Sequence, residues 1–155
     1  MYTKVTPVRP YWSAIRDKMF NHIRSAGFTI DEADIIGIND TDTELMSHLI
    51  TRQGHILLVP YNATSSNETT MKTGLDIIYA MSISMPELCQ SPIIMPVANS
   101  LANVLRTRLA EERATGRFTP EMDQQILFVS EADLDRPELT ERIRSHVEGR
   151  VQANS

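Results

Sequence analysis

The sequence contains a single cysteine, Cys89, among its 155 residues. One cysteine excludes an internal disulfide and any zinc site built from several cysteines. The histidines do not compensate for this lack, because none has the spacing of a metal-binding motif. They are His22, His48, His55 and His146. The sequence therefore predicts neither a metal site nor a cofactor.

Long apolar runs and an excess of positive charge are also missing. No apolar run approaches the roughly 18 residues of a membrane-spanning helix, and residues 1–10 lack the basic and then apolar layout of a signal peptide. The 15 Lys and Arg residues against 20 Asp and Glu residues leave a net charge of −5, which argues against broad binding to nucleic-acid phosphates. We therefore expect a cytoplasmic protein that binds neither membranes nor nucleic acid.

Several signatures of catalysis and nucleotide binding are absent as well. The chain has no G-x-G-x-x-G dinucleotide fingerprint, no G-x-x-x-x-G-K-[ST] phosphate loop and no G-x-S-x-G nucleophile elbow. Its composition is that of an ordinary folded domain, with 41% apolar and 23% charged residues. The length fits one domain, which we place at residues 1–150, followed by a frayed tail at 151–155.

What the sequence does contain is an alternation of short apolar runs with stretches of helical period. The five apolar runs cover residues 3–8, 35–38, 55–60, 93–97 and 126–129. Strands that alternate with helices predict an α/β fold, a three-layer α/β/α sandwich around a five-stranded parallel sheet. Right-handed crossovers give the flavodoxin-like strand order 2-1-3-4-5.

Ligands of such a sheet bind beyond the carboxyl ends of its strands, in the crevice where the strand order reverses. Residues 61–70, after the third strand, form a loop longer than is usual for this fold, rich in hydroxyls and amides. It leads into a helix N-terminus, which suits phosphate or carboxylate. The alternative is a solvated surface loop. The candidate binding residues are Arg9, Tyr11, Tyr61, Asn62, Ser66 and Asn99.

Two acidic residues near this crevice are candidate catalytic groups. Asp76 lies one turn into the helix that follows the polar loop, and Glu68 lies in the loop itself. Asp76 has a plainer alternative, a surface ion pair with Lys72 four residues earlier.

Receiver domains, which accept a phosphoryl group, have this same fold. They carry an acidic pair after the first strand, an aspartate at the end of the third and a lysine after the fifth. The corresponding places here are Val8-Arg9-Pro10, Pro60-Tyr61-Asn62 and Ser130-Glu131. A magnesium ion would find no cluster of carboxylates there. The sequence thus argues against a working phosphoreceiver and leaves a non-phosphorylated pseudo-receiver open.

One stretch, at about residues 56–97, resembles a more specific pattern. Asp76-Ile77-Ile78-Tyr79-Ala80, followed by Pro92-Ile93-Ile94-Met95-Pro96-Val97, is similar to Toll/interleukin-1 receptor (TIR) domains and to nucleoside deoxyribosyltransferases. In the enzymatic members a glutamate on this helix works on the ribose of a nucleotide or nucleoside. The resemblance implies that role for Asp76.

Two functions are compatible with these features. One is a non-catalytic signalling or assembly module of TIR-like or pseudo-receiver-like type, which binds a protein partner or itself and has a nucleotide as a candidate ligand. The other is a small enzyme that cleaves or transfers an N-glycosidic bond of a nucleoside or nucleotide. The enzyme hypothesis predicts that Asp76→Asn abolishes turnover and leaves the melting temperature nearly unchanged. The module hypothesis predicts that charge reversal of Arg106 and Arg108 disrupts partner binding.

Overall fold

Four short apolar segments form the strands of one parallel sheet in the computed structural model, which describes residues 2–9, 13–37, 40–61 and 73–153. The strands are β1 (Val5–Pro7), β2 (Ile56–Leu58), β3 (Ile93–Val97) and β4 (Ile126–Ser130), in the spatial order β1-β2-β3-β4. In the register, Val5 lies opposite Ile56, and Leu57 lies opposite Ile93. The predicted α/β fold with a parallel sheet is confirmed.

The predicted number of strands is wrong, because the run at residues 35–38 does not form a strand. It contributes one isolated parallel bridge between Val8 and Ile36, and a second bridge joins Lys4 to Thr29. Between the two bridges the chain forms the acidic 3-10 turn η1 (Glu32–Asp34). After Ile36, Gly37 adopts a φ of 85°, a conformation that no regular strand contains. The other four predicted strands occur in their predicted relative order.

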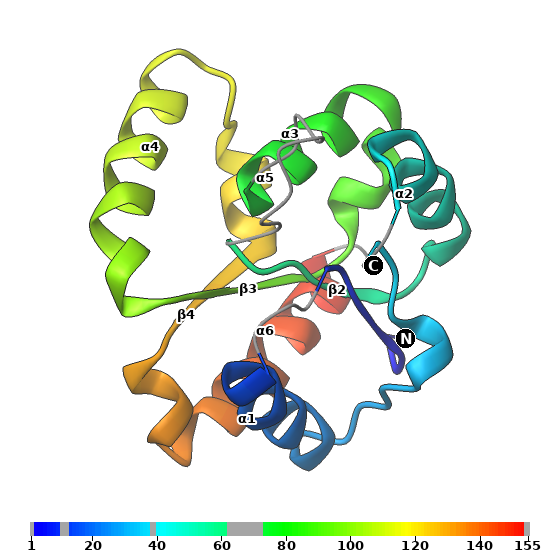
Figure 1. Cartoon of the computed structure of the whole chain (residues 1–155), viewed down its shortest axis with the longest axis vertical. Coiled ribbons are helices and arrows are strands. Elements are labelled where there is room, and N and C mark those ends of the chain that lie inside the picture. Colours follow the sequence, from blue (N-terminus) through cyan, green and yellow to red (C-terminus); the bar gives the residue numbers. More distant parts are fainter. Residues whose placement is uncertain (1, 10–12, 38–39, 62–72, 154–155) are drawn as a thin grey trace.

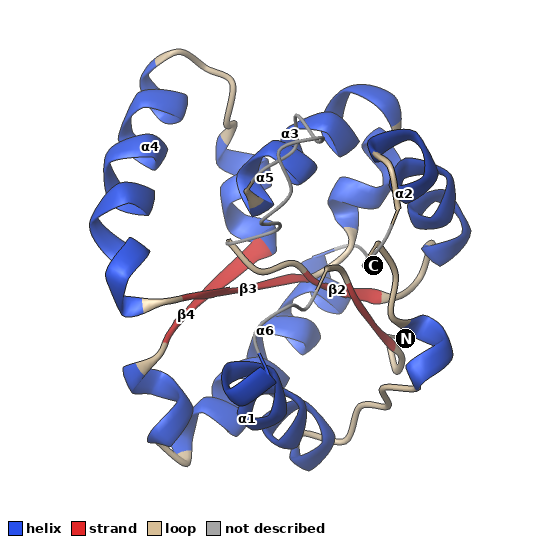
Figure 2. Ribbon diagram, in the orientation of Figure 1, coloured by secondary structure: helices blue, strands red, loops and turns tan. Residues whose placement is uncertain are grey.

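In the described part of the chain, six α-helices cover the two faces of the sheet (Figures 1 and 2). One face carries α1 (Ser13–Ser25) and α6 (Glu138–Ala153). The other carries α2 (Asp42–Leu49), α3 (Gly74–Ser84), α4 (Ala102–Ala114) and α5 (Pro120–Gln125). Short 3-10 turns join these elements, namely η1, η2 (Ile50–Arg52), η3 (Pro86–Gln90), η4 (Asn99–Leu101) and η5 (Ala132–Asp135). The result is the predicted three-layer sandwich.

Side chains of the strands alternate between two separate hydrophobic cores. Leu57 and Val59 belong to the core under α2, α3, α4 and α5, whereas Ile56 and Leu58 belong to the core under α1 and α6. This alternation follows from the two-residue period of a strand. Because both faces are covered, the strands are apolar at nearly every position, as the sequence predicted.

The last helix, α6, continues to Ala153, into residues 151–155, for which the sequence predicts a frayed tail. Within the part of the chain that the structure describes, no helix combines the length and apolar character needed to cross a membrane. The domain boundary at residue 150 stays a prediction.

Candidate functional site

Helix α3 begins in tight contact with the carboxyl end of β2. The amide of Gly74, its first residue, donates to the carbonyl of Tyr61 at 2.8 Å. A Cβ atom on Gly74 would lie 2.6 Å from the Pro60 carbonyl oxygen and 2.8 Å from Cε of Met95, so only glycine fits at this position. This approach brings Asp76 to the edge of the sheet where the sequence predicted a site.

The Asp76 carboxylate is held from two sides. It accepts a hydrogen bond from the backbone amide of Thr73 at 3.0 Å, and the Thr73 hydroxyl accepts one from the amide of Asp76 at 3.2 Å. This reciprocal pair is a capping box at the start of α3. From α4, Arg108 forms an ion pair with the other Asp76 oxygen and donates to the Thr73 hydroxyl at 3.0 Å. Asp76 thus joins the first turn of α3 to the middle of α4.

These contacts set the charge state of the group. Burial alone would raise the pKa of Asp76, but hydrogen bonds from Arg108 and Thr73 outweigh it and hold the pKa below its usual range. The hydrogen bond to Asp76 raises the pKa of Arg108 in turn. Asp76 is therefore a carboxylate and Arg108 a cation at neutral pH. The predicted surface partner, Lys72, lies outside the described residues, and the structure supplies Arg108 as a partner of Asp76.

Tyr61 is the second predicted residue in this neighbourhood. Its side chain is buried, and burial raises the pKa of its phenol, while the neighbouring Arg108 acts in the opposite direction. The Tyr61 phenol therefore remains protonated at neutral pH and places an uncharged hydroxyl beside the Asp76–Arg108 pair. The structure thus brings two of the predicted site residues, Tyr61 and Asp76, to the same arginine.

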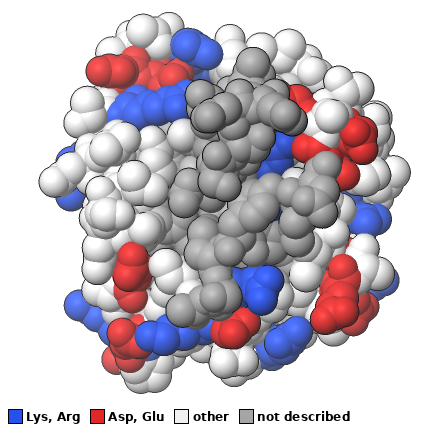
Figure 3. Space-filling view, in the orientation of Figure 1, with Lys and Arg blue, Asp and Glu red and all other residues white. Residues whose placement is uncertain are grey.

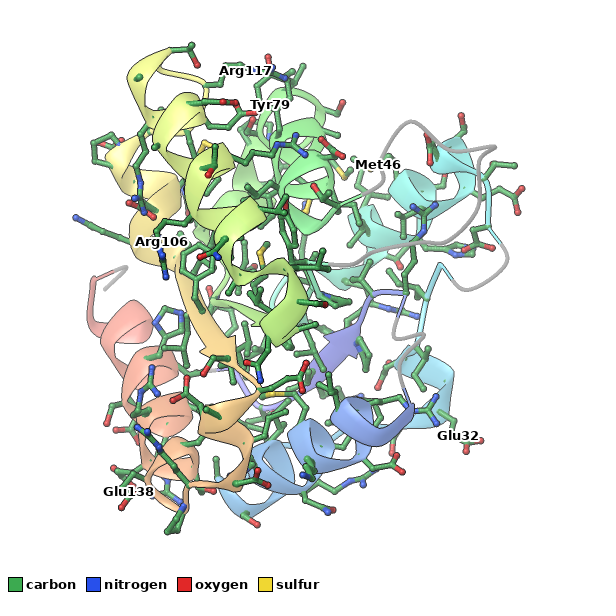
Figure 4. The ribbon with its side chains drawn as sticks, turned by 60° about the vertical axis from the view of Figure 1, so that its left-hand side comes forward. Glu32, Met46, Tyr79, Arg106, Arg117 and Glu138 are labelled. Atoms are coloured by element: carbon green, nitrogen blue, oxygen red, sulfur yellow. The ribbon has the colours of Figure 1, made fainter. Side chains whose placement is uncertain are left out.

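Further charged side chains extend the Asp76–Arg108 ion pair along α4. Glu112 forms ion pairs with both arginines, and its carboxylate lies 3.5 Å from Nε of Arg108 and 3.3 Å from Nε of Arg117. The Arg117 guanidinium lies 4.2 Å from the centre of the Tyr79 ring, on α3 (Figure 4). This network, from Asp76 to Tyr79, fixes α4 against α3. Arg108 therefore serves the packing of two helices, and a charge reversal there would disturb that packing as well as the surface.

Arg9 has a different environment, although the sequence predicted it for the same crevice. It is 1% exposed and has a φ of 48°. Its Nε donates to the carbonyl of Gly37 at 3.2 Å, and its Nη2 donates to the carbonyl of Asp40 and to the Asp42 carboxylate, each at 3.3 Å. Arg9 therefore ties the end of β1 to the start of α2.

The remaining predicted residues are spread over the molecule or lie outside the described residues. Asn99 is exposed at the start of η4, and its backbone amide donates to the Glu131 carboxylate at 2.9 Å. It lines a small cavity of about 220 Å³ together with Lys18, Glu131 and Asp135. The predicted residues outside the described part of the chain are Tyr11, Asn62, Ser66 and Glu68. Their roles stay predictions, as do those of Arg9, Tyr61, Asp76 and Asn99.

Sequence reasoning missed the partners that hold these groups. The pair Thr73 and Asp76 has the [ST]-x-x-[DE] spacing of a helix start, so the cap was visible in the sequence. The contact with Arg108 was not visible in the sequence, because Arg108 follows Asp76 by 32 residues and no local pattern links the two. Among the residues that the structure describes, no group of three or more His, Cys, Asp or Glu side chains is placed to hold a metal ion.

Comparisons with known proteins identify a fold and no family. No family model matches the sequence, and no curated protein matches it either. Among solved structures, the chain is similar to NtrX from Brucella abortus, solved in complex with ADP, with a TM-score of 0.57 and 14% sequence identity. The alignment covers 99% of this chain and 30% of NtrX. At this identity the likeness establishes the flavodoxin-like fold and nothing of the function.

Proposed function

We propose that this chain is a non-catalytic signalling or assembly module of receiver-like type, which binds another protein and accepts no phosphoryl group. The observation that carries this proposal is the position of Arg9. A receiver has an acidic pair after its first strand, and this chain has a buried guanidinium there. Receiver-like domains act through contacts with other proteins, and that role does not require the acidic pair.

The environment of Arg9 opposes the binding of a divalent cation. Magnesium takes carboxylate and phosphate oxygens as ligands. At the end of β1 the Asp42 carboxylate already pairs with Arg9 at 3.3 Å, and the carbonyls of Gly37 and Asp40 also accept hydrogen bonds from Arg9. A second cation there would meet a fixed positive charge in a poorly screened setting. The surroundings of Arg9 therefore disfavour the magnesium ion that phosphoryl transfer to a receiver requires.

The enzyme hypothesis finds less support in the same structure. A carboxylate that attacks or stabilises a ribose must face the substrate, whereas Asp76 caps α3 and pairs with Arg108. Nucleotide binding and a TIR-like character stay predictions. The ADP in the NtrX complex belongs to a protein of which this chain matches 30%, so it does not transfer.

Two measurements on the purified chain test the proposal. Incubation with acetyl phosphate and Mg²⁺, beside an active receiver as control, should leave the intact mass of this chain unchanged. Selection from a displayed library of random peptides should enrich a consensus sequence that binds the chain. A stable phosphoprotein would contradict the proposal. So would the absence of any peptide consensus together with a thermal shift by a nucleotide and release of its base.

A further inference from the structure

A groove with an apolar floor runs between α2 and α3. Its volume is about 580 Å³. Its apolar lining consists of Met46, Ile50, Ala80 and Met85, and its polar lining of Asp42, Thr43, Ser47 and Ser84. Ile50 is 52% exposed, and Ile83, one turn from Ala80 on α3, is 65% exposed. Figure 4 shows Met46 between these two helices. Of these two isoleucines only Ile50 lines the groove, and a large apolar side chain exposed beside an apolar groove is typical of an interaction site.

One wall of this groove belongs to an acidic segment of the chain. Residues 31–52, which include α2 and η2, contain six Asp and Glu residues and one basic residue, Arg52. This segment therefore carries a net charge of −5, which equals that of the whole chain, and the remaining residues balance. Buried Arg9, which pairs with Asp42, offsets one of these charges. Figure 3 shows acidic side chains gathered on the side of the molecule where α2 and η1 lie.

We propose that the groove between α2 and α3 is the docking site for a basic amphipathic helix of another protein. This inference rests on the proposed function as a protein-binding module and assigns its surface and its partner chemistry. The apolar floor provides burial for the apolar face of the helix. The negative potential of residues 31–52 favours lysine and arginine on its flanks and accelerates its association.

The same charge disfavours a second copy of this chain as the occupant. A twofold dimer through this groove would place the acidic segments of the two copies beside each other, because such an interface pairs each patch with itself. Like charges brought together at an interface oppose association. A basic partner meets no such repulsion, so the charge distribution selects a different protein.

The length of the groove defines the segment that fits. From Asp42 to Ile50 the helical chain rises by about 12 Å, at 1.5 Å per residue. Two turns of a partner helix have this length and present apolar residues at positions i, i+3, i+4 and i+7. A peptide of that pattern is the probe that follows from the structure.

Three synthetic peptides and three forms of the protein test the assignment. The first peptide carries leucine at i, i+3, i+4 and i+7 with lysine on its flanks, the second has glutamate in place of lysine, and the third has the leucines scrambled. The protein is used as wild type, Ile50→Gln and Val104→Gln. Val104 lies on α4 and is 53% exposed, so it matches Ile50 in exposure on a different surface.

Fluorescence anisotropy should give a clear order of affinities. We expect Ile50→Gln to weaken binding of the lysine peptide about fivefold, and Val104→Gln to leave it unchanged. The glutamate and scrambled peptides should bind at least about tenfold more weakly than the lysine peptide. Added salt should weaken the lysine peptide as well, because screening reduces the attraction.

Several outcomes would overturn the assignment. The assignment fails if Ile50→Gln and Val104→Gln weaken binding equally, if the lysine and glutamate peptides bind equally well, or if no peptide binds. A wild-type dimer in sedimentation that Ile50→Gln converts to a monomer would make a second copy the occupant. If library selection gives a consensus that Ile50→Gln does not affect, the groove assignment fails and the proposed function stands. If selection gives none and a nucleotide is cleaved, both fail.

Discussion

Two arginines at the carboxyl edge of the sheet each pair with an aspartate at the start of a helix, but their surroundings differ. Arg9 pairs with Asp42 at the start of α2, and Arg108 pairs with Asp76 at the start of α3. Arg9 is 1% exposed and donates to carbonyl groups as well, whereas the Arg108 side chain is 27% exposed and shares its charge among acidic groups. The Arg9 guanidinium is therefore part of the core, whereas both members of the Asp76–Arg108 pair are partly exposed.

Replacement of Arg9 should have the largest effect on stability. Arg9→Met removes a buried cation and the hydrogen bonds that it donates to the Gly37 and Asp40 carbonyls and to the Asp42 carboxylate. We expect a loss of about 3 kcal/mol in the free energy of unfolding, at the low end for a broken buried pair because Asp42 is partly exposed. Urea denaturation measures it. Arg9→Lys should recover only part of the loss, since lysine cannot reproduce the planar fork. Full recovery of the free energy of unfolding by Arg9→Lys would mean that the positive charge alone, and not the planar guanidinium, stabilises this site.

The contact of Gly74 with Pro60, at the start of the helix that carries Asp76, should give the second largest effect on stability. Gly74→Ala places a methyl group 2.6 Å from the Pro60 carbonyl, so α3 must shift away from β2. We expect a loss of about 2 kcal/mol, the cost of overpacking a rigid site. Gly149→Ala is the control, because a Cβ there meets nothing within 4 Å and lies in a helix, so it should stabilise the chain by up to about 1 kcal/mol. Equal effects of the two substitutions would contradict the close contact.

Asp76→Asn should have a smaller effect, and one that differs from the sequence-based expectation. The enzyme hypothesis predicts a nearly unchanged melting temperature, but the structure places Asp76 in a cap and an ion pair. We expect a loss of about 1–2 kcal/mol in the free energy of unfolding. Asp17→Asn, at a carboxylate that is 73% exposed beside Arg16, is the control and should change little. A stable Asp76→Asn variant that loses a nucleoside-cleaving activity would support the enzyme instead.

The smallest effect is the pH dependence of that second pair. The pKa of Asp76 lies below its usual 3.8 in the folded chain, so ionised Asp76 stabilises the fold above the unfolded pKa. This stabilisation is lost as the pH falls through the folded pKa. The difference between wild type and Asp76→Asn in the free energy of unfolding should therefore be constant near neutral pH and shrink below about pH 4. A difference that grows on acidification would reverse the sign of the shift.

The parts of the fold that the sequence predicted are those with a local signal. The strands at Ile56–Leu58 and Ile93–Val97 are apolar at every position, and the helices after them show a clear helical period. The run at 35–38 is also apolar, but Gly37 has a φ of 85° and the run contributes one isolated bridge, so an apolar run alone did not identify a strand. Helix α5 also begins with a local signal, because Thr119 caps it and Pro120 is its first residue.

The candidate site was less predictable, because its geometry depends on contacts between distant segments. The sequence predicted Arg9 and Asp76 near one edge of the sheet, and both lie there. It did not predict that Arg9 is buried, since a charged residue beside Pro10 in a loop is usually exposed. The arginine that holds Asp76 comes from another helix, and its choice depends on the packing of α4 on α3.

The incomplete second strand has a consequence for how this chain behaves among its neighbours. The outer edge of β1 is occupied at both ends, where Val5 donates to Thr29 and Ile36 donates to Pro7. Between these points the acidic turn η1 bulges outward, and Pro7 has no amide hydrogen to offer. An incoming strand of another molecule needs an unbroken row of free donors and acceptors along an edge. Two bridges and one proline thus protect this side of the sheet from strand exchange and fibrous aggregation.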